Sequence, residues 1–298
     1  MTRTLDPLAP FEILLERAEG VAAPLPTPLA RLYGPLAFPR DAPGGAWVIS
    51  NFVASIDGVA AFSDPAADPV PRALAEISAS DPHDRALMGL LRAVADAVIV
   101  GAGTLRAVPT HLWSPGYIAP AYASAWGALR AALGKPPAPL AVIVSGGGVD
   151  TTLPVFQQAG DPALLVTTSS GAGRLAGATL GPRVRVHDAG ATISARAALD
   201  ATLAALDAQD APDTADATRS RLLLVEGGPR LLGQFVAEGL LDEQFLTIAP
   251  QLAGRDDHAR RPGLIEGQRL IPQRPTWARL ISARAAGDYL FLRYRLRP

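Results

Sequence analysis

Short, strongly apolar segments recur along most of this chain and alternate with segments of helical spacing. The apolar segments lie at 47–53, 97–100, 140–144, 163–167, 184–186 and 222–225. Between them, Leu87, Leu91 and Val94 share one face of a predicted helix, and residues 199–206 repeat that spacing. Strands that consist of continuous apolar residues are buried on both faces, as in parallel sheets joined by helices. The pattern therefore predicts an α/β fold with a mixed, mainly parallel sheet and helices on both of its faces.

The two ends of the chain differ from this middle part. Residues 278–283 and 289–296 alternate in polarity around Gly287 and Asp288, which predicts a closing C-terminal β-hairpin. Residues 1–45 begin with a short helical pattern at Phe11, Leu14 and Leu15 and then become rich in proline. We interpret 1–45 as an arm wrapped on a domain of residues 46–298, with a disordered tail as the alternative. The Ala-, Asp- and Thr-rich segment 211–220 is expected to be a solvated loop.

Composition excludes several classes of protein. The chain has 298 residues, 49% of them hydrophobic, which is enough for one large domain or two small ones. Its net charge of −1 argues against a nucleic-acid-binding surface or an anionic membrane surface. The absence of cysteine excludes disulfides, thiolate nucleophiles and Cys-based zinc sites. Without a secretory signal or an apolar run of membrane-spanning length, we expect a cytoplasmic protein.

Two strands of the predicted sheet run into glycine turns and then into helix starts, at 98–104 and 224–229. Glycine lets backbone N–H groups approach a ligand, and the following helix directs its positive dipole end toward an anion. Pro229 suits the first helical position. Two such turns on neighbouring strands could hold a pyrophosphate, although each turn alone is also typical of plain chain reversal. The Rossmann fingerprint is incomplete, because Arg106 stands where its third glycine would be.

Polar residues at strand ends are candidates for chemistry. Asp57 follows the first strand in a turn with Ser55, where it serves either as a turn cap or as a catalytic carboxylate. Glu226 comes directly after a buried strand, so it needs either an arginine partner or a ligand. Ser145 begins a glycine-rich turn that could contact a phosphate or a ribose. The histidines lack metal-ligand spacing, and no metal site is expected.

Together these residues resemble, in order, the reductase domain of the bifunctional riboflavin-biosynthesis deaminase-reductase, a relative of dihydrofolate reductase. The matching segments are 51–58, 84–92, 95–96, 100–106, 226–229, 239–243 and 248–250. The resemblance implies a dihydrofolate-reductase-like fold. It also implies a homodimer that uses NADPH to reduce the ribosyl group of 5-amino-6-(5-phosphoribosylamino)uracil to ribityl.

The resemblance also assigns roles to residues of this chain. Asp57 and Glu226 would flank the nicotinamide and the substrate as catalytic residues, with Asn51 and Ser55 on the substrate side. The expected cofactor-binding residues are Gly101, Gly103, Thr104, Ser145, Gly227 and Gly228. Of these, the glycines and Thr104 would hold phosphates, and Ser145 would lie near the adenosine 2′-phosphate.

The chain departs from the family pattern on the substrate side. Val59 stands where a lysine often follows the Ser-x-Asp-Gly motif, and residues 108–110 replace an expected acidic residue. The deaminase half with its zinc-binding cysteines is absent. Two alternatives therefore stay open: an NADPH reductase of another pterin or pyrimidine, or a nucleotide-binding homologue without catalysis.

Overall fold

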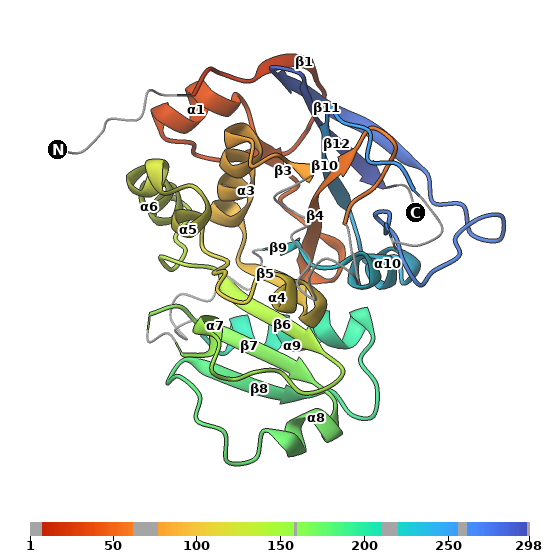
Figure 1. Ribbon diagram of the computed structural model, residues 1–298. Helices are drawn as coiled ribbons and strands as arrows, with labels where there is room; N and C mark the ends of the chain where they lie inside the picture. The colour runs from red at the N-terminus through yellow and green to blue at the C-terminus, as the bar shows by residue number, and fades with distance from the viewer. Residues whose placement is uncertain (1–7, 62–76, 158–159, 210–219, 256–260, 297–298) are drawn as a thin grey trace.

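The computed structural model describes residues 8–61, 77–157, 160–209, 220–255 and 261–296 (Figure 1). Its main sheet has the strand order β1-β11-β12-β10-β4-β9-β5-β6-β7-β8. These strands are β1 (Glu12–Glu16), β4 (Ala46–Ser55), β5 (Ala97–Gly101), β6 (Leu140–Ser145), β7 (Ala163–Thr167), β8 (Val184–Asp188), β9 (Arg221–Val225), β10 (Glu243–Ala249), β11 (Ala278–Ala286) and β12 (Tyr289–Leu296). A separate small ribbon pairs β2 (Val21–Ala22) with β3 (Ala37–Phe38).

The helices lie on both faces of this sheet. They are α1 (Thr27–Tyr33), α3 (Pro82–Val94), α4 (Ala102–Ala107), α5 (Pro115–Ile118), α6 (Ala123–Ala132), α7 (Pro154–Gln157), α8 (Ser169–Arg174), α9 (Ala195–Asp207) and α10 (Pro229–Ala237). Short 3-10 turns occur at Pro43–Gly45 and Pro120–Tyr122. None of the helices in the described segments is long and apolar enough to cross a membrane.

The sheet is parallel from β10 to β8 and antiparallel at the other end, which confirms the predicted mixed, mainly parallel sheet. Each apolar segment found in the sequence is a strand, and the helices at 82–94 and 195–207 confirm the helical spacing. The C-terminal hairpin is also confirmed, because β11 and β12 pair antiparallel around Gly287. Of the expected loop at 211–220, only Ser220 lies within the described residues.

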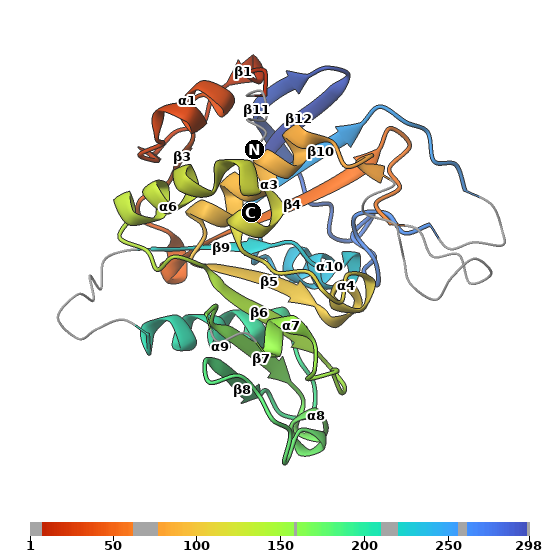
Figure 2. The same cartoon turned by 60° about the vertical axis from the view of Figure 1, so that its left-hand side comes forward.

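The central strands bury both faces, which explains why they are continuously apolar. Ile49, Leu224 and Phe245 face one core with the helices α3 and α6. Val48 and Val225 face a second core with α9 and α10. Figure 2 shows these helix layers on either side of the twisted sheet. The face that carries α3 is important for the site, since the polar residues described below lie on it.

The N-terminal segment differs from its prediction. Residues 12–16 form the edge strand β1, which pairs antiparallel with β11, so the helical pattern expected at Phe11, Leu14 and Leu15 is wrong. Pairing with a distant strand outweighs weak local periodicity in a short segment. The proline-rich part still packs on the domain: Leu29 and Tyr33 of α1 are buried in the α3 core, and Phe11 packs edge-on against Phe291. The domain boundary at 45/46 stays a prediction.

Candidate functional site

The two glycine turns lie side by side at the carboxyl edge of the sheet. Strands β5 and β9 pair parallel, with Ile99 opposite Val225, and each continues into its turn. A Cβ atom on Gly101 would lie 3.9 Å from the carbonyl oxygen of Gly227. Helices α4 and α10 start directly after these turns and neighbour each other in both views (Figures 1 and 2). This juxtaposition is the one that the sequence predicts.

The two turns require glycine at their different positions for different structural reasons. A Cβ atom on Gly227 would lie 2.3 Å from the Cα of Val100, so this glycine is required by packing against β5. Gly228 instead has a φ of 55° and caps α10, and the nearest atom to its virtual Cβ is the Thr104 hydroxyl oxygen at 3.7 Å. Gly103 is similarly open, with only Arg106 Nη2 at 4.0 Å. The open surface of the two turns is therefore formed by Gly103, Thr104 and Gly228.

Ser145 lies at the end of β6, next to the first glycine turn. Its hydroxyl is buried and donates to the Gly147 carbonyl at 3.0 Å, so it is used within its own turn. The adjacent backbone also has a basic neighbour that sequence reasoning missed. Virtual Cβ atoms on Gly147 and Gly148 lie 3.9 Å from the side chain of Arg174, an exposed residue of α8. A single arginine in a short segment rich in small residues gave no usable signal.

Asp57 is held in the turn after β4. Its Oδ1 accepts hydrogen bonds from the Ser55 hydroxyl at 2.6 Å and from the Ala253 N–H at 3.0 Å, and its Oδ2 accepts from the Gly254 N–H at 2.8 Å. The hydrogen bond from Ser55, followed by those from the backbone, lowers the pKa of Asp57 to about 2. The carboxylate therefore ties the β4 turn to the segment after β10, and it carries no proton near neutral pH.

Glu226 forms a buried ion pair, which confirms the arginine-partner alternative. Arg92 of α3 donates from Nε and Nη2 to Glu226 Oε2 at 2.9 and 2.7 Å, and both side chains are almost fully buried. Arg92 Nη2 also contacts His111 Nε2 at 3.0 Å. Burial, and then the nearby positive charge of Arg92, lower the pKa of His111 to about 3. His111 is therefore neutral, and its Nε2 accepts from Arg92.

Sequence reasoning did not identify Arg92 and His111 as members of this site. Arg92 follows two leucines in an otherwise apolar helix face, which is a weak sign of a buried charge partner. Nothing in the local sequence marks His111, because its partner arginine lies nineteen positions earlier.

Asn51 and Ser55 lie on β4, on the face covered by α3. Ser55 is occupied by the turn, since its hydroxyl donates to Asp57 and accepts from the Val59 N–H at 3.0 Å. Asn51 is buried, and its Oδ1 has no hydrogen-bond partner within the described part of the chain. The same holds for the hydroxyl of Thr247 on β10. Thr247 was not anticipated from the sequence.

The two departures from the family pattern differ in burial. Val59 is fully buried in a small apolar cluster with Val53, Ile77 and Ala249. Val108 ends α4 and packs against the α3 core. Neither position presents a charged group to the carboxyl edge of the sheet.

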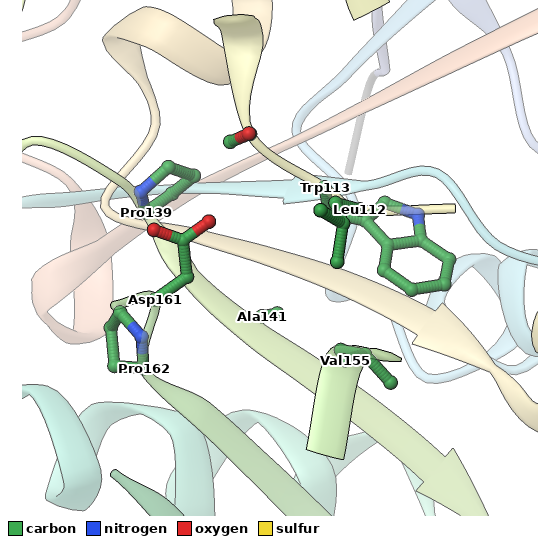
Figure 3. A pocket seen from close by; sticks show the side chains of 8 residues that line it. Leu112, Trp113, Pro139, Ala141, Val155, Asp161 and Pro162 are labelled. Atoms are coloured by element: carbon green, nitrogen blue, oxygen red, sulfur yellow. The ribbon is translucent and has the colours of Figure 1, made fainter. Parts of the chain in front are cut away.

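A small hollow elsewhere does not belong to this site. Pro139 and Asp161 precede β6 and β7, and Trp113 and Val155 complete its wall (Figure 3). It therefore lies at the amino ends of these strands, opposite the glycine turns. Among the residues with a described placement, no three His, Asp or Glu side chains are grouped to bind a metal.

The mixed sheet with its carboxyl-edge glycine turns and C-terminal hairpin defines a protein of the dihydrofolate-reductase-like class. The family model described as RibD C-terminal domain matches residues 46–284. The chain therefore belongs to the RibD C-terminal domain family, the reductase family of riboflavin biosynthesis, and is of the oxidoreductase type. A comparison with curated protein sequences gave no match.

Solved structures share the fold at low identity. A pyrimidine reductase-like protein from Corynebacterium diphtheriae superposes with a TM-score of 0.59 at 20% identity, over 85% of this chain and 92% of that one. RibD from Acinetobacter baumannii superposes with a TM-score of 0.54 at 18% identity, over 86% of this chain and 59% of that one. The deaminase/reductase from Thermotoga maritima superposes with a TM-score of 0.52 at 15% identity, over 84% of this chain and 56% of that one. This chain thus spans somewhat more than half the length of the last two.

Proposed function

We propose that this chain is a cytoplasmic, NADPH-dependent reductase that converts the ribosyl group of 5-amino-6-(5-phosphoribosylamino)uracil to ribityl. The observation that carries the proposal is the open surface of Gly103, Thr104 and Gly228 between two neighbouring strand ends. A Cβ atom at 228 would fill the space beside Thr104, and such a cradle suits a phosphate.

The residues present fit NADPH. Helix α10 directs its first N–H groups toward Gly228, and a helix N-terminus stabilises an anion. Arg174, beside the glycines that follow Ser145, supplies a positive charge suited to the 2′-phosphate that distinguishes NADPH from NADH. Gly101 and Gly227 would hold the two turns together, and Gly227 does so by packing rather than by contact with the cofactor.

When bound, NADPH would supply a hydride to C1′ of the ribosyl group; the bond between C1′ and the ring oxygen must break, and one proton must reach that oxygen. Asp57 is ionised at neutral pH, so its role is to orient the sugar and stabilise positive charge rather than to donate the proton. Glu226 is neutralised by Arg92, and this pair fixes the end of β9 next to the cofactor cradle. Asn51 and Ser55 would lie on the substrate side.

One observation favours a second candidate, an NADPH reductase of another pterin or pyrimidine. The lysine that often follows the Ser-x-Asp-Gly motif is replaced by Val59, which is fully buried. A phosphorylated substrate would then lack that cationic contact. Retention of Asp57 and Glu226 argues against a homologue without catalysis.

The test is single-turnover oxidation of NADPH by the purified protein with the uracil intermediate, with NADH as the matched control. The proposal requires turnover with NADPH and a clear affinity preference for it in calorimetric titration. Equal or undetectable binding of both nucleotides would refute it. An Arg174→Ala variant should lose most of the preference while its NADH affinity is unchanged.

A homodimer is part of the same proposal. Leu290 on β12 is 39% exposed and lies in an apolar, strand-rich region that could form an interface, although Phe291 beside it is buried. Sedimentation equilibrium at micromolar concentration tests this directly. A monomer under those conditions would contradict it.

A further inference from the structure

His111 lies beside the buried ion pair of Arg92 and Glu226. Its Nε2 contacts Arg92 Nη2 at 3.0 Å, and the same Arg92 nitrogen donates to Glu226 Oε2 at 2.7 Å. The imidazole nitrogen and the carboxylate oxygen are therefore within about 6 Å of each other. Because Glu226 is followed directly by the second glycine turn, His111 belongs to the surroundings of the proposed cofactor cradle.

The backbone ties His111 to the other side of the same cradle. The Val108 N–H donates to the Thr104 carbonyl at 3.0 Å, and the His111 N–H donates to the Val108 carbonyl at 3.0 Å. Two successive turns thus connect His111 with the threonine of the cradle. The intervening residues 108–110 are those that replace an acidic residue of the family pattern. His111 therefore lies next to the place where this chain lacks a polar group.

The contact with Arg92 decides which nitrogen of the His111 ring carries the proton. A guanidinium has donors only, so Nε2 must accept from Arg92, and the ring proton is then on Nδ1. Burial, followed by the positive charges of Arg92 and Arg85, lowers the pKa of His111 to about 3. The ring therefore stays neutral around pH 7, with Nδ1–H as a donor of fixed position.

The Nδ1–H group of His111 is available to a ligand. It forms no hydrogen bond with any residue of described placement, yet Nδ1 is not one of the buried polar atoms that lack a partner, so it reaches the surface. Two aromatic rings hold the imidazole, with the Tyr117 centroid at 4.7 Å and the Trp113 centroid at 5.3 Å. A held N–H group of this kind suits an oxygen on which negative charge develops.

The proposed reaction needs such a donor. When the bond between C1′ and the ring oxygen breaks, the electron pair of that bond stays on the oxygen, which finally takes a proton. Asp57 is ionised near neutral pH, and Glu226 is a carboxylate paired with Arg92. An ionised carboxylate only accepts hydrogen bonds, so neither of these groups stabilises the departing oxygen.

We propose that His111 is a further catalytic residue, whose Nδ1–H donates a hydrogen bond to the ring oxygen of the ribosyl group as the bond to C1′ breaks. A neutral imidazole is too weak an acid to give up this proton, so His111 stabilises the charge on the oxygen, and water supplies the proton of the new hydroxyl. This inference rests on the proposed reductase function and adds a residue to its mechanism.

Replacement of His111 by Nδ1-methylhistidine separates the two ring nitrogens. The methyl group removes the Nδ1–H donor, while Nε2 keeps its lone pair for Arg92. We expect the single-turnover rate of NADPH oxidation with the uracil intermediate to fall by roughly 10²-fold, as when an oxyanion donor is removed. NADPH affinity and the urea midpoint should stay unchanged, which a merely structural role would not explain. The same replacement of His187, exposed on β8, is the control and should leave the rate unchanged.

Two amide substitutions separate catalysis from packing by reach. The amide nitrogen of His111→Asn takes the place of Nδ1 but leaves Arg92 without its acceptor, so the rate should stay within about tenfold of wild type while stability falls. In His111→Gln the amide extends to the place of Nε2 and can accept from Arg92, so stability should be kept while the rate falls as in the methylated protein. The reverse order of the two rates would overturn the inference.

A measurement without turnover tests the same assignment. Nitrogen NMR of the protein labelled with ¹⁵N-histidine should show the His111 ring protonated on Nδ1 only, with no titration between about pH 5 and pH 8, since Arg92 and Arg85 face the ring and Glu226 is paired with Arg92. The signal is assigned by its loss in His111→Asn. A ring protonated on Nε2, or one that titrates in this range, would overturn the inference.

The failure of this inference differs from the failure of the reductase proposal. A wild-type rate in the protein with methylated His111 would overturn the catalytic role of His111 and leave the reductase standing. Absence of NADPH oxidation by the wild-type protein would refute the reductase, and the role of His111 with it.

Discussion

The two ends of β10 bury polar groups in opposite ways. At its start, Glu243 is fully buried and accepts from both Arg293 and Arg295, with Arg293 Nε at 2.8 Å and Arg295 Nη2 at 2.8 Å. Near its end, Thr247 is equally buried but unsatisfied. Complete buried networks fix a structure, whereas incomplete ones on the same strand indicate where a ligand completes the set. The comparison therefore separates residues that hold the hairpin from a threonine whose hydroxyl takes no part in that network.

The largest expected effect lies in the complete network. Replacing Arg293 with methionine leaves Glu243 with one cationic partner and removes the guanidinium that lies 4.9 Å from the Phe245 ring. We expect a loss of about 3 to 5 kcal/mol in the free energy of unfolding, as for other broken buried pairs. Urea denaturation measures it. Thr247→Val is the contrasting variant, and if it destabilised the protein equally, the two ends of β10 would not differ as described.

Gly227 and Gly228 allow a comparison of the same kind, between a structural residue and a ligand-facing one, within one turn. Gly227→Ala places a Cβ atom 2.3 Å from the Val100 backbone, and we expect a stability loss of about 3 kcal/mol through overpacking. Gly228→Ala strains a residue at a φ of 55° by about 1 kcal/mol and should mainly weaken NADPH binding, roughly tenfold. Thermal unfolding and calorimetric titration of both variants test this. A folded Gly227→Ala protein with wild-type stability would contradict the packing role.

Asp57 tests whether a fully hydrogen-bonded carboxylate also contributes to turnover. Asp57→Asn removes the charge and turns an amide donor toward a backbone N–H. We expect NADPH affinity to be retained and the single-turnover rate to fall by roughly 10²-fold, within the range of charge and proton effects at active sites. Ser55→Ala removes one hydrogen bond but retains the charge, so its rate should fall much less. Equal rates for the two variants would assign Asp57 to the turn alone.

The smallest expected effect is on the pH dependence of stability that Asp84 causes. Burial raises the pKa of Asp84 from its ordinary value of 3.8 to about 6 in the folded protein, so the folded state binds more protons between these values. Stability therefore falls as pH rises from about 4 to about 6. Asp84→Asn should flatten this slope and stabilise the protein at pH 7 by on the order of 2 kcal/mol. Burial also raises the pKa of Asp242 to about 6, so the part of the pH dependence of stability that Asp242 causes remains in this variant. Denaturant midpoints across this pH range measure the difference, and parallel profiles for variant and wild type would contradict it.

The sequence predicts the central sheet because strands buried on both faces are apolar at every position. It also predicts that the glycine turns meet, because parallel neighbouring strands end at the same edge. Thr247 was not predicted, because a single threonine inside a strand has no periodic signature. Asp84 looks like an ordinary first-turn acid of a helix. Strand β1 was missed for a related reason: its partner lies at the far end of the chain.

The pairing of β1 with β11 has a consequence for how the chain is made. Glu12 lies opposite Ala285, so the edge strand β1, which precedes the other strands of the main sheet in the chain, has no partner until β11 has been made. The central strand β4 also waits, since both of its neighbours, β9 and β10, come much later. Contacts this distant in sequence slow folding and leave strand edges open meanwhile. The apolar residues Ile13 and Leu14 would then be exposed on the nascent chain. A chaperone that binds extended apolar segments would be able to bind them before β11 is made.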